Sequence, residues 1–215
     1  KIPGSPVAYW VSEKFIRTFE MGTLGDYVNA VKGLDTCDND TFVRSWYEVE
    51  MCNIGFHIND TVDTIEQRWF PYCKGGGYSK WFGFVEKIVD WTDDGVLLRN
   101  LRNENGKIKS RPQNTRYYFK EGLTFSTITS YKLSIRYMNH CIFGGGGSGI
   151  FTDINNLYFM SFLNSVVSEY ALNLLNPTLN FLVGDILSLP AIIDETHKPQ
   201  IEALVEDCII TSEMD

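Results

Sequence analysis

The segment at residues 141–151, CIFGGGGSGIF, has the glycine spacing of a cofactor-binding loop. Gly144, Gly146 and Gly149 satisfy the pattern G-x-G-x-x-G, which can hold a dinucleotide or a methyl-donor cofactor. Such a loop follows a strand and opens a helix, because the amide N–H groups at the helix start bind the ligand. Here IFTDINN follows Gly149, and a helical period begins only near Asn155. We therefore expect a flexible, hairpin-like turn and no cofactor bound by this segment.

Other motifs that could do chemistry are incomplete. NPTLNF at residues 176–181 lacks the second Pro and the adjacent aromatic residue of the Asn-Pro-Pro-Tyr/Phe loop that holds a flipped base. The acidic stretch DTCDND around Asp38 lacks the Gly and Glu of a calcium-binding EF-hand loop. The five Cys form no C-x-x-C pair, and the three His are far apart. We therefore expect no metal site, no catalytic residue in this segment and reduced thiols in a cytoplasmic protein.

The charge is distributed unevenly along the chain, although the 215 residues carry a net charge of -8. Residues 68–136 hold 13 Lys and Arg against 6 Asp and Glu, so the middle third is basic and the flanks are acidic. A local basic region leaves a polyanionic partner possible. No run of 18 apolar residues and no signal peptide are present, so we expect no membrane association. The missing initiator Met indicates a piece of a longer protein.

The pattern of apolar residues predicts a mixed α+β domain, which would position the glycine run and the basic residues. Alternation predicts strands at residues 42–51 and 133–143, and aromatic, β-branched segments predict further strands in the centre. From residue 155 to 175 the apolar residues recur every three or four positions, which predicts one helix ending at Asn176 and Pro177. A final helix is expected to open at Pro199. We expect twisted, mostly antiparallel strands in the centre, with packing helices.

Five segments occur in an order that resembles a known family. They are IPGSPVAYWVSEKF, KGLDTCDNDTFVRSWYEV, YCKGGGYSKWFG, RPQNTRYYFKEGLTFSTITS and FLNSVVSEYALNLLNPTLNFLVGDILSLP. Together they resemble the target-recognition part of large adenine-specific DNA methyltransferases, of the PglX-like (BREX phage-defence) and Type IIG restriction-modification kinds. The resemblance covers nearly the whole chain and implies a fold similar to the target-recognition domains of restriction-modification specificity subunits. It also implies an upstream methyltransferase domain, absent here, that binds S-adenosylmethionine.

The resemblance implies boundaries and local matches. Residues 1–22 would be a linker and helix from the upstream domain, 23–190 the target-recognition domain, and 191–215 the start of a C-terminal helix. The family pattern Gly-x-x-Thr-Gly-x-Asn is matched by Gly33, Thr36 and Asn39, with Cys37 in place of the second Gly. The KGG segment followed by KW is matched at positions 74–76, 80 and 81.

The expected partner is double-stranded DNA. Lys and Arg would neutralise phosphates, Gln and Asn could read adenine, and glycines would let the backbone approach the duplex. The candidate DNA-binding residues are Lys32, Lys74, Gly75, Gly76, Lys80, Lys107, Lys109, Arg111, Gln113, Asn114 and Arg116. Each cation could equally be a solvated surface charge. An acidic protein-interaction or DNA-mimic module, motivated by the flanks, and a carbohydrate-binding domain, motivated by the aromatics, are the alternatives.

Overall fold

The computed structural model describes residues 10–64, 66–129 and 131–214. Residues 1–9 of the predicted N-terminal linker lie outside these ranges. The mixed α/β architecture is confirmed, with two four-stranded sheets. None of the helices in the described ranges is both long and apolar enough to cross a membrane.

The first sheet is antiparallel throughout. Its strands, in spatial order, are β1 (Asn29–Val31), β8 (Gly147–Phe151), β5 (Gly122–Ser126) and β6 (Ile135–Met138). The second sheet contains β2 (Val43–Ser45), β4 (Lys87–Asp90), β3 (Trp69–Cys73) and β7 (Ile142–Phe143). Only its β3–β7 pair is parallel. The strands of both sheets are nearly all buried, which explains their apolar sequences.

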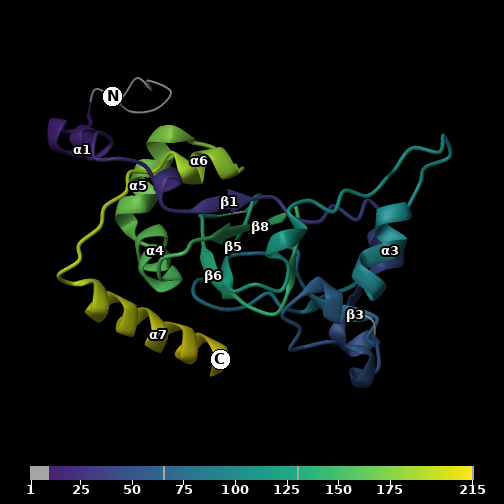
Figure 1. Cartoon of the computed structure of the whole chain (residues 1–215). Helices are drawn as coiled ribbons and strands as arrows, with labels where there is room; N and C mark the ends of the chain where they lie inside the picture. Colours follow the sequence, from purple (N-terminus) through teal and green to yellow (C-terminus); the bar gives the residue numbers. More distant parts are fainter. Residues whose placement is uncertain (1–9, 65, 130, 215) are drawn as a thin grey trace.

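Helices cover the first sheet mainly from one side (Figure 1). They are α4 (Asn156–Leu163), α5 (Val166–Leu175), α6 (Val183–Leu187) and α7 (Lys198–Met214), with α1 (Glu13–Thr18) packed beside α5. The other two helices, α2 (Asn39–Phe42) and α3 (Thr92–Asn100), accompany the second sheet. The 3-10 turns are η1 (Leu24–Asp26), η2 (Trp46–Glu48), η3 (Met51–Asn53), η4 (Thr61–Asp63) and η5 (Thr115–Tyr117).

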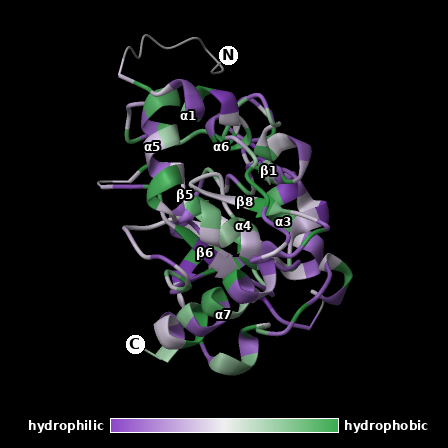
Figure 2. Ribbon diagram, turned by 90° about the vertical axis from the view of Figure 1, so that its left-hand side faces the viewer, coloured by the Kyte–Doolittle hydropathy of each residue, from purple (hydrophilic) through white to green (hydrophobic). Residues whose placement is uncertain are grey.

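Two hydrophobic clusters hold these layers together. Leu123, Ile135 and Ile150 of the first sheet pack against Phe159 and other residues of the helices. A second cluster contains Phe70, Val89 and Phe143 of the second sheet. Figure 2 shows that α7 carries both hydrophobic and hydrophilic residues. Its residues Ile201, Val205 and Ile209 lie on one face of the helix, which packs on the first cluster.

Three predicted elements are wrong in their extent or continuity. The predicted strand at residues 42–51 is a strand only at β2 (Val43–Ser45), because the chain turns into the 3-10 helix η2 at Trp46. The predicted helix at residues 155–175 is two helices, because Asn164 leaves the helix to bond a strand and Ser165 caps α5. The predicted strand at residues 133–143 is β6 and β7, which lie in different sheets. His140, between them, has a φ of 52°, a turn conformation that alternation along the sequence does not reveal.

Candidate nucleic-acid interface

Strands from both sheets end at the same edge of the molecule. β1 and β5 both run antiparallel to β8, so Lys32 and Ser126 lie where β8 begins at Gly147. In the second sheet β3 and β7 run parallel and end together, which brings Lys74 there as well. Segments far apart in sequence therefore meet at this edge. We call it the basic face and define it by Lys32, Lys74, Lys109 and Arg111.

The glycine run connects the two sheets at this edge, and the hairpin-like turn expected there is wrong. β7 pairs with β3, whereas β8 pairs with β1 and β5, so residues 144–146 carry the chain from one sheet to the other. A Cβ added to Gly147 would lie 2.3 Å from the Cys73 carbonyl oxygen. One added to Gly145 would lie 2.2 Å from a carboxylate oxygen of Asp35. The glycines are needed for close backbone packing.

A small hollow lies beside the run. Its volume is about 260 Å³, and Thr36, Asn39, Lys74 and Gly146 are among its lining residues. Thr36 and Asn39, which match the family pattern, are joined by a 2.7 Å hydrogen bond from the threonine hydroxyl. Lys74 also lines a second hollow of about 370 Å³ that reaches toward Lys87. Lys74 thus lines two hollows, the first also lined by Asp35 and the second by Asp40 and Glu48.

Cys37 stands at the position where the pattern that this segment resembles has Gly, and its backbone conformation is one that favours glycine. Its φ is 55°, in the left-handed region that favours glycine. A cysteine in this conformation costs about 1 kcal/mol in backbone strain.

The segment at residues 111–114 is held against residues 32–35. Arg111 and Asp35 exchange two backbone hydrogen bonds of 2.8 and 3.1 Å. The Asn114 amide nitrogen donates to the Lys32 carbonyl oxygen at 2.9 Å, and the Gln113 amide makes longer contacts to Asp35 and Gly33. Both amide nitrogens are therefore engaged within the protein. That Gln113 and Asn114 read adenine stays a prediction.

The remaining predicted DNA-binding residues lie in different parts of the molecule. Gly75 and Gly76 follow Lys74, and Gly75 faces the Gly146 backbone with a φ of 91°. Lys107 lies on a projecting arm, and Arg116 lies past the pairing of residues 111–114, with its guanidinium group over the Tyr117 ring at 4.8 Å. Lys80 is separated from the group, because its ammonium group donates to the Asn164 carbonyl oxygen at 2.7 Å.

The arm comprises residues 101–110 and projects beyond the second sheet (Figure 1). Backbone hydrogen bonds from Lys109 to Leu101 and from Asn103 to Lys107 pair its two sides. Gly106 forms its tip with a φ of 73°. All residues from 102 to 109 are exposed. It is a two-stranded ribbon that carries Arg102, Lys107 and Lys109 away from the core.

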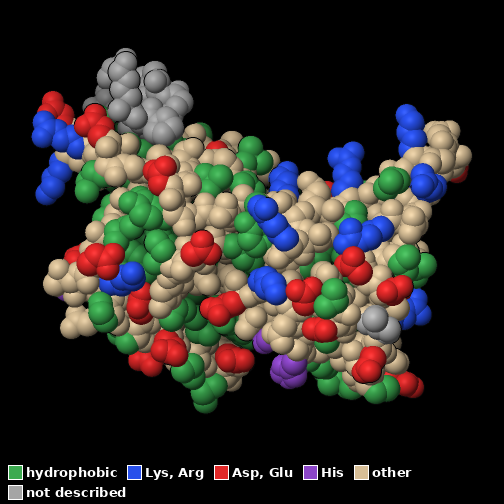
Figure 3. All heavy atoms as spheres, viewed as in Figure 1, with side chains coloured by type: hydrophobic (Ala, Val, Ile, Leu, Met, Phe, Trp, Pro, Cys, Tyr) green, Lys and Arg blue, Asp and Glu red, His purple; other side chains and the backbone are tan. Residues whose placement is uncertain are grey.

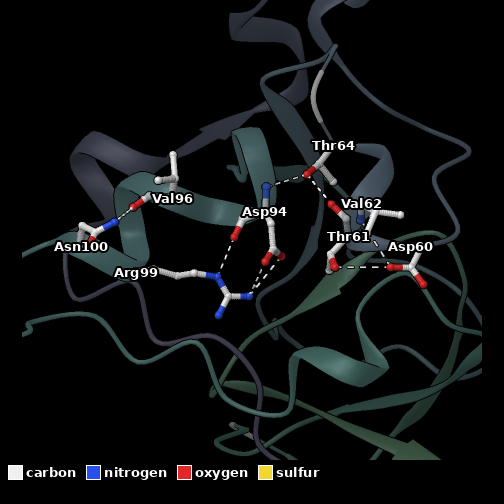
Figure 4. A network of polar contacts seen from close by, with 8 residues as sticks. All are labelled: Asp60, Thr61, Val62, Thr64, Asp94, Val96, Arg99 and Asn100. Carbon is white, nitrogen blue, oxygen red and sulfur yellow. Dashed lines mark hydrogen bonds and ion pairs between the residues drawn. The ribbon is translucent and has the colours of Figure 1, made fainter.

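A polar network anchors the helix that leads into this arm (Figure 4). Arg99 donates from Nε to the Asp94 carbonyl oxygen at 2.7 Å and pairs with the Asp94 carboxylate at 3.1 Å. The Asp94 amide donates to the Thr64 hydroxyl at 2.8 Å. Arg99 is therefore fully engaged by the protein, and α3 is fixed to the segment that precedes β3.

The cations of the basic face differ from most others in their partners. In the described part of the chain, the side chains of Lys32, Lys74 and Arg111 make no ion pair or hydrogen bond, and neither does that of Lys107. The fourth cation of the basic face, Lys109, pairs with Asp38 at 4.0 Å. Elsewhere five cations are ion-paired in the described residues, in Arg68–Asp90, Arg99–Asp94, Lys120–Asp60, Lys132–Glu169 and Lys198–Glu195. Figure 3 shows Lys and Arg side chains gathered along the upper edge of the molecule, out to the arm.

Beneath this edge lies a buried cation that the sequence did not single out. Arg136 of β6 is only 1% exposed, and its guanidinium group donates to the Ser126 hydroxyl at 3.1 Å. The same hydroxyl accepts the Gly76 amide at 2.9 Å. Arg136 thus supports the loop after Lys74 from inside, and burial lowers the pKa of its guanidinium group. A charge within the apolar run LSIRYM was the available signal.

Two thiols border this buried region. The sulfur atoms of Cys73 and Cys141 lie 3.2 Å apart. The hydrogen bond from Cys141, helped by the charge of Arg136, lowers the pKa of Cys73, whereas that bond and burial raise the pKa of Cys141. The residues in the described ranges form no group of three or more His, Cys, Asp or Glu side chains able to hold a metal ion.

No family model matches the chain, but two curated proteins are similar to it along its whole length. It is 35% identical over 221 residues to the adenine-specific methyltransferase PglX of Lacticaseibacillus casei (strain Zhang), of which it covers 18%. It is 37% identical over 222 residues to the adenine-specific methyltransferase BrxX of Escherichia coli O9:H4 (strain HS), of which it covers 17%. The chain therefore corresponds to less than a fifth of each relative.

Proposed function

We propose that this chain is the part of an adenine-specific DNA methyltransferase that binds double-stranded DNA and selects its sequence. In the parent protein an upstream domain would bind S-adenosylmethionine and transfer the methyl group to an adenine turned out of the duplex. A BREX or related phage-defence system is the expected setting. The similarity of the whole chain to PglX and BrxX supports the methyltransferase association.

The observation that supports the DNA-binding role is that three of the four cations defining the basic face have no ion pair or side-chain hydrogen bond among the described residues, the exception being Lys109, which pairs with Asp38. Lys32, Lys74 and Arg111 come from three separate segments and converge where strands of both sheets end. Asp38 pairs with Lys109, and Asp35 lines the same hollow as Lys74, so acidic side chains offset part of the charge at this edge. The remaining like charges repel one another, and a bound polyanion would relieve that repulsion. Duplex DNA supplies one phosphate charge about every 1.7 Å along its axis.

The face and the arm offer different contacts. Lys32 and Lys74 lie close to backbone turns and are suited to phosphates, which fix position without reading sequence. The arm is a two-stranded ribbon of a size that the major groove admits. Arg111, at its base, could read a guanine edge with its two parallel N–H donors. In this arrangement sequence selection belongs to the arm and Arg111.

The net charge of -8 does not oppose this role. Figure 3 shows Lys and Arg side chains along the upper edge, whereas acidic side chains are spread over the rest of the visible face and some lie beside this edge. The acidic protein-interaction module remains the alternative function, and it predicts no salt-dependent binding to DNA.

The test is the salt dependence of duplex binding by the parent methyltransferase. A variant with Lys32→Ala and Lys74→Ala should flatten the slope of log affinity against log salt by up to about 2, since each phosphate contact contributes about 0.9. The matched control replaces Lys120 and Lys198, which are ion-paired in the structure. That control should keep the wild-type slope. Absence of duplex binding by the wild type, or equal slopes for both variants, would contradict the proposal.

A further inference from the structure

We propose that Tyr78 and Tyr131 form an aromatic contact that stacks on DNA bases beside the basic face. This inference rests on the proposed function. The two rings are 5.3 Å apart at an interplanar angle of 88°, so they form an edge-to-face pair. They remain 41% and 59% exposed, and nearby in the chain Ile128 is 73% exposed. A contiguous exposed patch of aromatic and apolar side chains often marks an interaction site.

The pair is continuous with the basic face. Tyr78 follows the glycines after Lys74, and Tyr131 lies in the loop that leaves β5 at the same edge. A hydrogen bond of 2.9 Å from Gly76 to Ser126 joins the two loops. Another of 3.0 Å from Thr127 to the Gly146 carbonyl oxygen joins them to the glycine run. A duplex on Lys74 would therefore extend toward these rings.

Lys132 contacts the Tyr131 ring without adding an unpaired charge to this patch. Lys132 places its ammonium group 5.3 Å from the centre of the Tyr131 ring and pairs with Glu169 at 2.8 Å. That ion pair raises the pKa of Lys132 and keeps the group charged. Because Glu169 already neutralises this cation, Lys132 has little charge left for a phosphate. The patch is thus aromatic and close to neutral, next to a face that is basic.

Such a patch suits bases more than phosphates. Aromatic side chains stack on nucleobases, and apolar side chains enter base steps that a protein opens. Stacking involves no counterion release, so its contribution to affinity should not depend on salt. The Tyr78–Tyr131 pair and the Lys32–Lys74 pair are therefore separable in one experiment.

The experiment measures duplex binding by the parent methyltransferase over a salt series. A variant with Tyr78→Ala and Tyr131→Ala should bind about 10- to 100-fold more weakly at every salt concentration, with an unchanged slope. A variant with Tyr78→Phe and Tyr131→Phe keeps the rings and should retain the affinity. The matched control is Tyr27→Ala, because Tyr27 is 37% exposed, contacts one ring and lies before β1, at the opposite end of the first sheet.

Each outcome decides between the two proposals. Wild-type affinity of the double Ala variant, or an equal loss in the Phe variant, would overturn the aromatic contact. A flattened slope in the Ala variant would also overturn it, because it would indicate lost phosphate contacts. If the aromatic contact fails while the Lys32 and Lys74 variant still flattens the slope, the proposed function stands. If wild-type protein does not bind duplex DNA, the proposed function itself fails.

Discussion

Gly147 has no room for a side chain, because the backbone of residues 73–75 lies directly against it. An added Cβ would lie 2.3 Å from the Cys73 carbonyl oxygen and 2.5 Å from the Gly75 nitrogen. Neither neighbour is the flexible end of a side chain, so the backbone itself would have to shift. At the scale of single residues, the glycine run is therefore part of the support for Lys74.

A Gly147→Ala substitution should lower the free energy of unfolding by about 1–3 kcal/mol, as overpacking does. Urea denaturation monitored by tryptophan fluorescence measures this change. Gly184→Ala is the control, because a Cβ there meets nothing within 4 Å and the residue lies in α6. The control should be neutral or slightly stabilising. Equal stability of the two variants would show that the close packing of Gly147 is not important.

At the scale of elements, Asn164 is the link between the helices and the first sheet. Its side chain accepts from the Ile135 amide at 2.9 Å and donates to the Ile135 carbonyl oxygen at 3.0 Å. It therefore pairs with β6 as a neighbouring strand would. The helix is interrupted at this residue, and the Lys80 ammonium group binds the carbonyl oxygen that the break leaves free.

Replacing Asn164 by Ala should destabilise the protein by about 1–3 kcal/mol, because the buried Ile135 amide loses its acceptor. The Ile135 carbonyl oxygen loses one of two donors and keeps the Trp81 amide at 3.0 Å. Thermal unfolding followed by circular dichroism would measure this destabilisation. Asn173→Ala on α5 is the control, since that side chain is exposed, and it should change stability by less than about 0.5 kcal/mol. A similar, small effect of both substitutions would contradict the bridging role of Asn164.

The sequence pattern predicted the types of the elements, but it did not predict the residues at which the elements break. Period and composition were sufficient for the α+β class and for the final helix near Pro199. The break at Asn164 could not be predicted, because its cause is a strand 29 residues away in sequence. Likewise, the roles of Arg136 and of the glycine run depend on contacts between sheets. In the candidate site, composition indicated the basic region but not that Lys80 is engaged elsewhere.

At the scale of the whole molecule, Lys and Arg side chains gather along one edge, although acidic side chains are spread over the visible face (Figure 3). A local excess of positive charge of this kind would let a chain with a net charge of -8 bind DNA through one face. The account assigns sequence selection to the predicted target-recognition domain, residues 23–190, and methyl transfer to another domain. The choice of DNA sequence should then move with residues 23–190.

The most direct measurement is methylome sequencing of cells that express parent methyltransferases with this domain exchanged. Residues 23–190 would be replaced by the corresponding segment of a relative that methylates a different sequence, and the reciprocal exchange would be made in that relative. The account predicts that each hybrid methylates adenine in the sequence of the protein that donated the segment. Hybrids that methylate the sequence of the recipient protein would contradict it.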